Sequence, residues 1–515
     1  MSPYQSYAEY YHEKTKYSPE GLASTQHRID FSQQPAPYKE YPNKKFIDLS
    51  SLLPLDRNPF SDVGIKNPDK FSEDEKSLSL IAKLLYFSNG ITAMLPYADK
   101  PFYMRASPSA GGLYPTEIYV IVQDYKGLEN GIYNFQVSKQ GIAYLQKGDF
   151  KDELLKITFN HPSVNECNLF IVLTGVFYRS SWRYQDRAYR RICLDTGHVI
   201  GNIDLVGYSL DIKPILIGGF NDKLANELLS LDENEEQTLA IIPLLENKKI
   251  KNDSVFLPSA LPSKLIPQNT KTPEGMRLLE LHNRSRINNF SPIPNVSVKD
   301  TEEKFKFSAQ IPLIKELKIF NWKNNLLNTI IKRRSTRAFS GAPLQEVDLI
   351  GILDFAYHSE LFVKDKFDTA PAYFDLSLLE TFVAVNSMEG FEDGCYYYSK
   401  KGRYFRQVRF KNFREEIHYL CLGQELGLKA SAVIFHTCDL SRAIFKYGER
   451  AYRYIHMDAG HLGERVNLAA INLDLGVSGI GGFFDDNVND ILGIPEDQAV
   501  VYITVLGYPH LQIDG

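Results

Sequence analysis

The spacing of apolar residues predicts a succession of helices and strands over the first half of the chain. Residues 1–77 are polar and interrupted by Pro, Ser, Asn and Asp, which predicts an extended arm with short elements. Beyond the arm, apolar positions recur first at helical intervals and then as short continuous runs typical of buried strands. The predicted elements are a helix at 78–87, strands at 118–122, 131–135 and 169–176, a helix at 185–210 and a strand at 239–245.

The same order of elements returns in the second half of the chain. A proline-rich segment of mixed charge, residues 250–318, separates the two halves and is typical of a linker. The elements predicted after it are a helix at 349–357, strands at 378–385, 394–398 and 432–437, a long helix at 451–475 and a strand at 499–506. The predicted organisation is an arm (1–77), a first domain (78–249), a linker (250–318) and a second domain (319–515).

A shift of 263 residues superimposes the two halves and indicates an internal duplication. Residues 183–222 align with 446–485 without gaps, and 17 of these 40 positions are identical. The matching runs include Arg187–Arg190 with Arg450–Arg453, and Gly218–Phe220 with Gly481–Phe483. Two copies favour a pseudo-dimer related by one two-fold-like operation, because a solenoid needs three or more units.

Composition and charge exclude several classes of partner. The 515 residues suggest two domains, and a net charge of −5 gives no bulk attraction to nucleic acid or anionic lipid. No apolar signal segment is present, and no apolar run reaches the about 18 residues that a membrane span needs. The five cysteines are scattered without a CxxC pair, which suits buried thiols in a reducing compartment. We therefore expect a cytoplasmic protein without membrane or nucleic-acid partners.

The segment Arg105–Pro115, with the sequence RASPSAGGLYP, is the first candidate for a binding site. Its small residues precede a predicted strand and include Pro108, Ser109, Ala110 and Gly111. Small side chains let a backbone approach a flat ligand closely, although a Gly-Gly pair is also common in a simple turn. In the second copy the corresponding residues 371–374 read Pro-Ala-Tyr-Phe, so rings replace the small side chains.

A basic cluster opens the second copy and has no counterpart in the first. It combines hydroxyl and guanidinium donors within a few positions: Arg333, Arg334, Ser335, Thr336 and Arg337. Arginine offers bidentate geometry to phosphate oxygens, and the alternative is a solvated basic turn. The first copy reads GIKNPDKFSEDE at the equivalent place and lacks an arginine pair. Each copy therefore keeps half of a candidate site, and the two halves are complementary.

Two glycine- and acid-containing motifs have both a functional and a structural interpretation. Gly481 and Gly482 can present backbone N–H donors to a ligand, or they can form a turn. The Asp-x-Gly-His runs at 195–198 and 458–461 lie on predicted helices and have no further ligand cluster near them in sequence. We expect these Asp and His residues to bond neighbouring backbone, and we expect no metal site.

A Lys-Tyr pair is the candidate for acid–base chemistry. Lys446 and Tyr447 precede the long helix of the second copy, and Arg183 and Tyr184 occupy that place in the first. A lysine or a tyrosine can act as a base when its pKa is lowered, whereas an arginine effectively cannot. The alternative is that these are ordinary surface residues.

Together these motifs resemble the nitroreductase superfamily, and within it the SagB-type dehydrogenases of thiazole- and oxazole-modified peptide biosynthesis. The resemblance covers about residues 78–246 and 320–510. It rests on Arg-Arg-Ser-x-Arg at 333–337, Pro-Ser-Ala-Gly-x-Leu-Tyr-Pro at 108–115, Gly-x-Tyr hairpins at 131–135 and 394–398, Lys446-Tyr447, Tyr-Arg-x4-Asp-x-Gly-His at 452–461 and Gly-Gly-Phe at 481–483. It implies an α+β fold of two fused nitroreductase-like domains. Each would be a mostly antiparallel sheet flanked by helices, and the two would pack as an intramolecular pseudo-dimer.

The resemblance also implies one FMN site that the two copies share. In the family the Arg-Arg-Ser-x-Arg element holds the FMN phosphate, and the small-residue segment of the partner subunit lines the other side of the flavin. The second copy would supply Arg333, Arg334, Ser335, Arg337, Gly481 and Gly482, with Gln424 as a further contact. The first copy would supply Pro108, Ser109, Ala110 and Gly111. The mirror site, with Ala372-Tyr373-Phe374 and no arginine cluster, is expected to hold no FMN.

The family chemistry is the oxidation of a thiazoline or oxazoline ring to the aromatic azole, with FMN taking the hydride. The Lys-Tyr pair fits the base, so we expect Lys446 and Tyr447 to be catalytic, with Tyr184 in this role if the pair serves the mirror site. The substrate would be a peptide or carrier-bound azoline, and biosynthetic enzymes would be partners of a monomer or a further dimer. Two alternatives stay open: an NAD(P)H-dependent nitroreductase-like enzyme for a small acceptor, and a flavin-poor scaffold of a biosynthetic complex.

Overall fold

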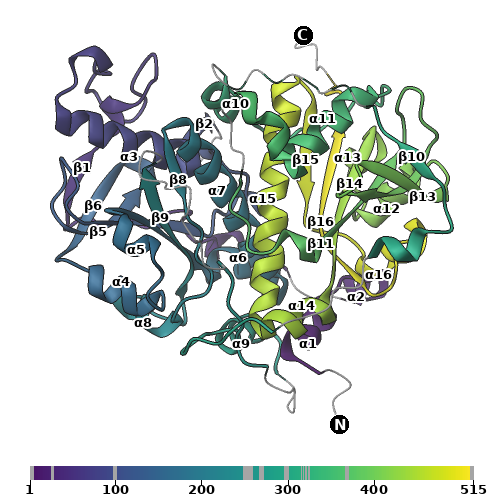
Figure 1. The fold of residues 1–515 in the computed structure, drawn as a ribbon, viewed down its shortest axis with the longest axis horizontal. Helices are drawn as coiled ribbons and strands as arrows, with labels where there is room; N and C mark the ends of the chain where they lie inside the picture. The colour runs from purple at the N-terminus through teal and green to yellow at the C-terminus, as the bar shows by residue number, and fades with distance from the viewer. Residues whose placement is uncertain are drawn as a thin grey trace.

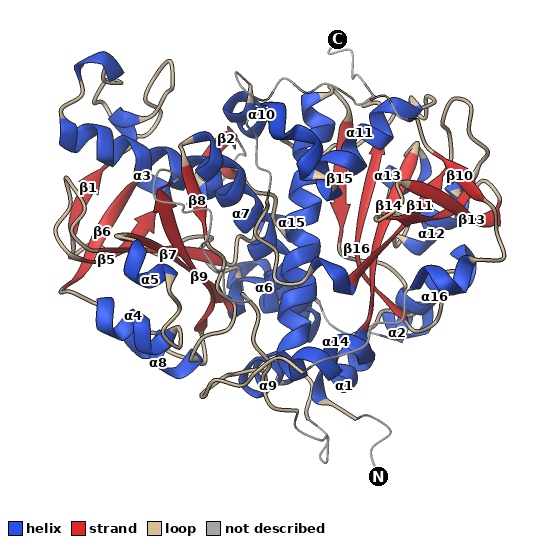
Figure 2. Ribbon diagram, in the orientation of Figure 1, coloured by secondary structure: helices blue, strands red, loops and turns tan. Residues whose placement is uncertain are grey.

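The chain folds into two lobes, one from each half of the sequence, with two long helices between them (Figure 1). Each lobe has one large sheet flanked by helices, which confirms the expected α+β class of two fused domains (Figure 2). The computed structural model describes residues 5–24, 28–96, 101–246, 259–265, 272–294, 301–314, 316, 318, 320, 322, 325–365 and 370–510.

The two large sheets have the same strand order and seven described strands each, and their neighbouring strands run antiparallel. The first sheet contains, in spatial order, β1 (Lys45–Asp48), β6 (Gly141–Lys147), β5 (Gly131–Gln136), β4 (Thr116–Val122), β7 (Leu169–Val176), β9 (Glu236–Glu246) and β8 (Ile212–Pro214). The second contains β10 (Gln310–Pro312), β13 (Tyr404–Phe410), β12 (Gly394–Ser399), β11 (Leu379–Val385), β14 (Ala432–Asp439), β16 (Gln498–Gly507) and β15 (Gly476–Ile480). A separate hairpin joins β2 (Ile91–Leu95) to β3 (Phe102–Arg105).

Helices cover both faces of these sheets, and for this reason central strands such as β4 and β11 are buried along their whole length. The described helices of the first half are α1 (Tyr7–Lys14), α2 (Pro19–Ser24), α3 (Glu73–Asn89), α4 (Lys151–Ile157), α5 (Ser163–Glu166), α6 (Phe177–Tyr184), α7 (Ala188–Ser209) and α8 (Asp222–Leu228). Those that follow are α9 (Arg277–Arg284), α10 (Leu326–Lys332), α11 (Glu346–Tyr357), α12 (Arg414–Leu420), α13 (Glu425–Leu428), α14 (Leu440–Tyr447), α15 (Ala451–Asn472) and α16 (Asp485–Leu492). None of them is both long and apolar enough to cross a membrane.

The lobes meet where α7 and α15 cross, and glycine makes the crossing possible. A Cβ added at Gly197 would collide with the backbone oxygen of Met457, and one added at Gly460 would collide with that of Leu194. The two helix backbones are therefore in direct contact. Nearly every residue of both helices is buried, because each helix packs on its own sheet and on its counterpart.

Two buried ion clusters connect the lobes reciprocally. Asp485 of the second copy binds Arg187 and Arg190 of the first, each at 2.7 Å. In the opposite direction, Asp222 of the first copy binds two residues of the second, Arg450 at 2.6 Å and Arg453 at 2.9 Å. All of these side chains are at most 4% exposed, so they form the polar centre of the pseudo-dimer interface.

The duplication extends into the arm and into the segment expected as a linker. The first N–H groups of α1, at Tyr7 and Ala8, donate to the Glu449 carboxylate at 3.0 and 2.7 Å. In the same way, Leu278 of α9 donates its N–H to Asp186, the counterpart of Glu449, at 3.2 Å. An acidic group at a helix N-terminus satisfies free donors and the helix dipole. Each of these helices is thus anchored on the opposite copy.

Matching histidines support the same conclusion. His12 on α1 hydrogen-bonds the hydroxyl of Tyr452 at 3.1 Å, and His282 on α9 hydrogen-bonds that of Tyr189, the counterpart of Tyr452, at 3.0 Å. The α1 and α9 helices also contact each other, side by side below α15 in Figure 1. The duplicated unit therefore includes a helical arm that crosses to the other lobe before its own sheet begins.

Candidate functional site

A cavity of about 280 Å³ lies between the two copies and is lined by both of them. From the first copy its lining includes Pro108, Ser109, Ala110, Gly111, Tyr184, Arg191, Leu194, Asp195 and His198. From the second copy it includes Ser335, Arg337, Leu422, Gln424, Gly479, Ile480, Gly481, Gly482 and Tyr502. The structure thus brings the small-residue segment, the glycine pair and part of the basic cluster to one place.

The small-residue wall is held by Asp195 on α7. The Ser109 hydroxyl donates to the Asp195 carboxylate at 2.5 Å, and the Ala110 N–H donates to it at 3.2 Å. Ser109 also accepts the N–H of Tyr114 at 2.8 Å, so its hydroxyl fixes both ends of the loop. Gly111 has a φ of +65°, and a Cβ there would lie 2.7 Å from the Tyr184 hydroxyl. The aspartate of the Asp-x-Gly-His motif therefore shapes this wall.

Burial raises the pKa of Asp195 to about 7. In the unfolded chain this carboxyl titrates at a lower pH, so the folded chain binds more protons between the two values. Folding stability must then fall as pH rises through this window. Wild type should lose unfolding free energy between pH 5 and pH 8, and we expect Asp195→Asn to reduce this loss by an amount on the order of 1–3 kcal/mol. Urea unfolding at pH 5 and at pH 8 measures the free energy of unfolding. Asp62→Asn, at an exposed aspartate, is the control. Equal losses of unfolding free energy in wild type and Asp195→Asn would contradict the expectation.

The basic cluster divides between the cavity and the lobe interface. Ser335 and Arg337 line the cavity, and within the described part of the chain no hydrogen bond or ion pair engages the Arg337 guanidinium. Arg333 is buried and donates to the carbonyl of Ala106 at 2.8 Å, while Arg334 donates to the carbonyl of Thr92 at 3.1 Å. The structure therefore places Arg333 and Arg334 against the first copy's backbone, outside the cavity lining.

The Lys-Tyr pair of the second copy lies apart from this cavity. Lys446 forms an ion pair with Asp375 at 2.5 Å, and the Tyr447 hydroxyl donates to the same carboxylate at 3.0 Å. Asp375 follows the ring-bearing segment 372–374, so the pair belongs to the mirror position. At the cavity itself the corresponding pair is Arg183 and Tyr184, and the hydroxyl of Tyr184 lies against Gly111.

The mirror position is filled by side chains. The ring of Phe374 lies against Gly218 so closely that a Cβ there would collide with it, and Leu261 does the same at Gly219. The Tyr454 hydroxyl accepts the N–H of Leu261 at 3.2 Å and donates to its carbonyl at 3.0 Å. Rings and a leucine thus occupy the space that corresponds to the cavity.

Two groups in the cavity were not singled out from the sequence: Arg191 on α7 and Tyr502 on β16. The Arg191 guanidinium stacks on the ring of Tyr184, 3.7 Å from its centroid. The Tyr502 hydroxyl donates to Nε2 of His198 at 3.1 Å, and Nδ1 of His198 donates to the Leu194 carbonyl at 2.8 Å. Burial lowers the pKa of His198 to about 4. A sign of Arg191 was present in the alignment of the two copies, where Tyr454 replaces it.

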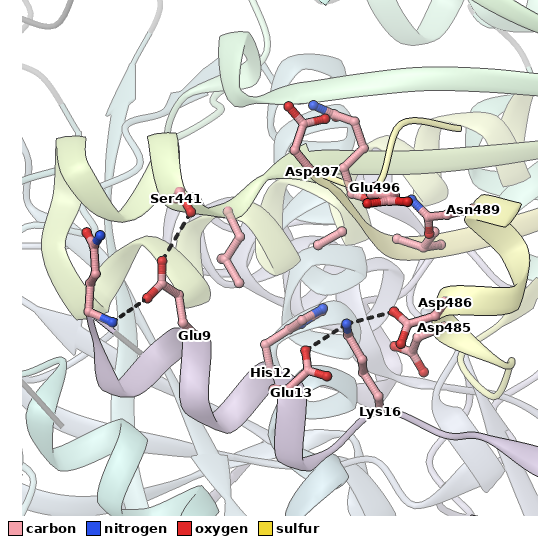
Figure 3. A pocket seen from close by; sticks show the side chains of 15 residues that line it. Glu9, His12, Glu13, Lys16, Ser441, Asp485, Asp486, Asn489, Glu496 and Asp497 are labelled. Carbon is pink, nitrogen blue, oxygen red and sulfur yellow. Dashed lines mark hydrogen bonds and ion pairs between the residues drawn. The ribbon is translucent and has the colours of Figure 1, made fainter. Parts of the chain in front are cut away.

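A second cavity, of about 330 Å³, lies beside the arm helix α1 and differs sharply in charge (Figure 3). Its acidic lining residues are Glu9, Glu13, Asp485, Asp486, Glu496 and Asp497. Lys16, which also lines it, forms ion pairs of 2.7 Å with Glu13 and with Asp486. Carboxylates repel a phosphate, so this cavity does not suit a phosphorylated ligand. No cluster of three or more potential metal ligands occurs among the described residues.

The sequence matches the family model described as the nitroreductase family twice, over residues 70–244 and 330–508. This chain belongs to the nitroreductase family. A crystal structure described as a "putative nitroreductase" from Anabaena variabilis is 44% identical, with a TM-score of 0.90, and the match covers 98% of this chain and 100% of that one. The arrangement of two nitroreductase domains in one chain is thus shared with a solved structure over nearly the full length.

Two curated relatives match parts of this nitroreductase-family chain. The "Putative nitroreductase" of Methanocaldococcus jannaschii is 32% identical over 189 residues, which are 36% of this chain and 90% of that protein. The "Trifolitoxin-processing protein TfxB" of Rhizobium leguminosarum bv. trifolii is 26% identical over 202 residues, which are 38% of this chain and 54% of that protein. Both matches are about the size of one of the two domains.

Proposed function

We propose that this protein is an FMN-dependent oxidoreductase of the SagB type that oxidises thiazoline or oxazoline rings to azoles in a peptide natural product. The observation that carries the proposal is the cavity between the copies, which is lined by a wall of small residues, by a glycine pair and by Arg337, an arginine that no described residue pairs. Nitroreductase-family proteins typically bind a flavin. The relative named as a trifolitoxin-processing protein supports a peptide substrate and biosynthetic partners.

The chemistry of the cavity suits FMN. Arg337 and Ser335 offer a guanidinium and a hydroxyl to the phosphate, and Arg333 and Arg334 would stabilise the interface behind them. Gly481, Gly482 and the Ser109–Ala110 loop leave room for a flat ring, because none has a side chain larger than a hydroxymethyl group. Gln424, at the N-terminus of α13, provides a further polar contact. When bound, FMN supplies the acceptor for a hydride.

Oxidation of an azoline also requires removal of a proton, and we assign the relay of this proton to bulk water to the Tyr184 hydroxyl. Tyr184 lines the cavity. Its counterpart Tyr447 and the neighbouring Lys446 are held by Asp375 at the mirror position. Asp195 orients the adjoining small-residue loop through Ser109, and Leu194, Leu422 and Ile480 add apolar side chains to the cavity lining.

The first test counts flavin. We expect one FMN per folded chain, because the mirror position is filled by Phe374, Leu261 and Tyr454. Equilibrium dialysis followed by absorbance of the released FMN gives the ratio. Two FMN per chain would contradict the shared single site, and none would favour the scaffold alternative.

The second test identifies the electron donor. An azoline-containing peptide is expected to bleach the flavin under anaerobic conditions and to lose two hydrogen atoms by mass spectrometry. Bleaching by NADPH, with no reaction of the azoline peptide, would instead support a nitroreductase-like enzyme for a small acceptor, as the naming of the Anabaena and Methanocaldococcus relatives suggests.

A further inference from the structure

The Arg191 side chain is a buried cation that no described residue pairs by a hydrogen bond or an ion pair. It is 5% exposed, and Nη1 has no hydrogen-bond partner. Within the described part of the chain, no hydrogen bond or ion pair engages its other nitrogen atoms. Buried polar groups are normally paired, and an unpaired buried charge is costly, so an arginine in this state indicates an anionic ligand. Arg191 lines the cavity at which we place FMN.

Neighbouring groups hold the guanidinium in place without neutralising it. The Tyr184 ring stacks on it at 3.7 Å, and the Tyr17 ring of the arm lies at 5.9 Å. Asp195 is one helical turn further along α7, and burial raises its pKa to about 7 although the Arg191 charge acts to lower it. Its carboxyl oxygens accept hydrogen bonds from Ser109 and Ala110, not from Arg191. The positive charge therefore remains available to a ligand.

Arg191 lies at the end of the cavity that contains the glycine pair. A Cβ added at Gly481 would lie 3.6 Å from Arg191 Nε, and one added at Gly482 would lie 3.6 Å from Nη2. These glycines are the ones proposed to lie beside the ring, whereas Ser335 and Arg337 are proposed to hold the phosphate. In the mirror position Tyr454 replaces Arg191 and bonds the backbone of Leu261 instead.

Given the proposed function, on which this inference rests, we propose that Arg191 binds the ring end of FMN and stabilises the negative charge that the ring gains on reduction. A hydride would bring two electrons and one proton to the ring. The substrate's second proton would pass through the Tyr184 hydroxyl to bulk water, so the ring would gain one negative charge. A guanidinium next to this charge favours the reduced form. Arg191 would thereby set the reduction potential, while Arg337 determines the affinity for the phosphate.

Sulfite provides a readout that does not depend on substrate turnover. Its sulfur forms a bond to N5 of the oxidised ring, and its electron pair leaves the ring anionic, so a nearby cation favours the adduct. We expect Arg191→Met to weaken sulfite binding about tenfold or more and to lower the reduction potential, with FMN still preferred over riboflavin. Arg191→Lys, which keeps the charge, should recover part of the sulfite affinity.

Arg337→Met is the matched control at the phosphate end. It should reduce the preference for FMN over riboflavin and leave sulfite affinity nearly unchanged. If Arg191→Met does not fold, Arg191→Gln, which keeps donors but no charge, answers the same question. The proposal would be overturned if Arg191→Met or Arg191→Gln kept the wild-type sulfite affinity and flavin reduction potential. It would also be overturned if the variant lost its preference for FMN over riboflavin. A wild-type protein that binds no FMN would overturn the proposed function itself and this inference with it.

Discussion

Ser109→Tyr is expected to abolish FMN binding although every residue of the basic cluster stays in place. The phenol ring would enter a cavity of about 280 Å³, and the substitution removes a short hydroxyl that bonds both the Asp195 carboxylate and the N–H of Tyr114. A loss of at least about 100-fold in affinity, equivalent to about 2.7 kcal/mol, is expected. Fluorescence titration of FMN measures the loss, and circular dichroism verifies the fold.

The duplicated chain offers a matched control for this substitution. Ala372 is the counterpart of Ser109 at the mirror position, where rings and Leu261 already fill the space. Ala372→Tyr should therefore keep FMN affinity within a few-fold of wild type. If Ser109→Tyr retains FMN as well as Ala372→Tyr does, the small-residue segment is not a wall of the flavin site.

Asp485→Asn and Asp222→Asn are expected to destabilise the fold more than other polar substitutions. Each aspartate binds two buried arginines of the opposite copy, and an amide cannot compensate their charge. Breaking a buried ion pair on one side typically costs about 3–5 kcal/mol, because it leaves an uncompensated charge. Urea denaturation, followed by tryptophan fluorescence and circular dichroism, measures the free energy of unfolding.

Asp486→Asn is the control, since Asp486 adjoins Asp485 in sequence but its side chain is 69% exposed and pairs with Lys16. Its loss should be below about 1 kcal/mol. Burial acts to raise the pKa of Asp485 and Asp222, but the paired arginines lower it further, so the net shift is downward. The stability that these two carboxylates contribute is therefore lost as pH falls through their folded-state pKa. Equal effects of Asp485→Asn and Asp486→Asn would show that the reciprocal clusters do not stabilise the interface.

The central elements of the fold could be predicted from the sequence, and the sheet edges could not. The strand expected at 432–437 is β14 and the helix expected at 451–475 is α15, because continuous burial makes their apolar patterns strong. Edge strands such as β1 and β10 are short and largely exposed, so they have no such pattern. Their pairing depends on neighbouring strands that lie about 100 residues away in the chain.

For the candidate site, the sequence identified complementary walls but not every group between them. The contrast between Ser109-Ala110-Gly111 and Ala372-Tyr373-Phe374 indicated which copy supplies each wall. Arg191 and Tyr502 gave no motif, because one lies inside a long buried helix and the other in a buried strand. Only the crossing of α7 over the second copy brings Arg191 to Gly481.

By itself the sequence determined the duplication, the fold class and the differences between the copies at 108–111 and 333–337, because these are properties of local pattern and of identity between the halves. The tertiary structure decided which groups meet. It placed Tyr184 at the cavity and Lys446 with Asp375 at the mirror position, and it anchored each arm helix on the opposite lobe. These contacts join residues far apart in the chain, and they depend on how α7 and α15 cross at Gly197 and Gly460, which no local pattern encodes.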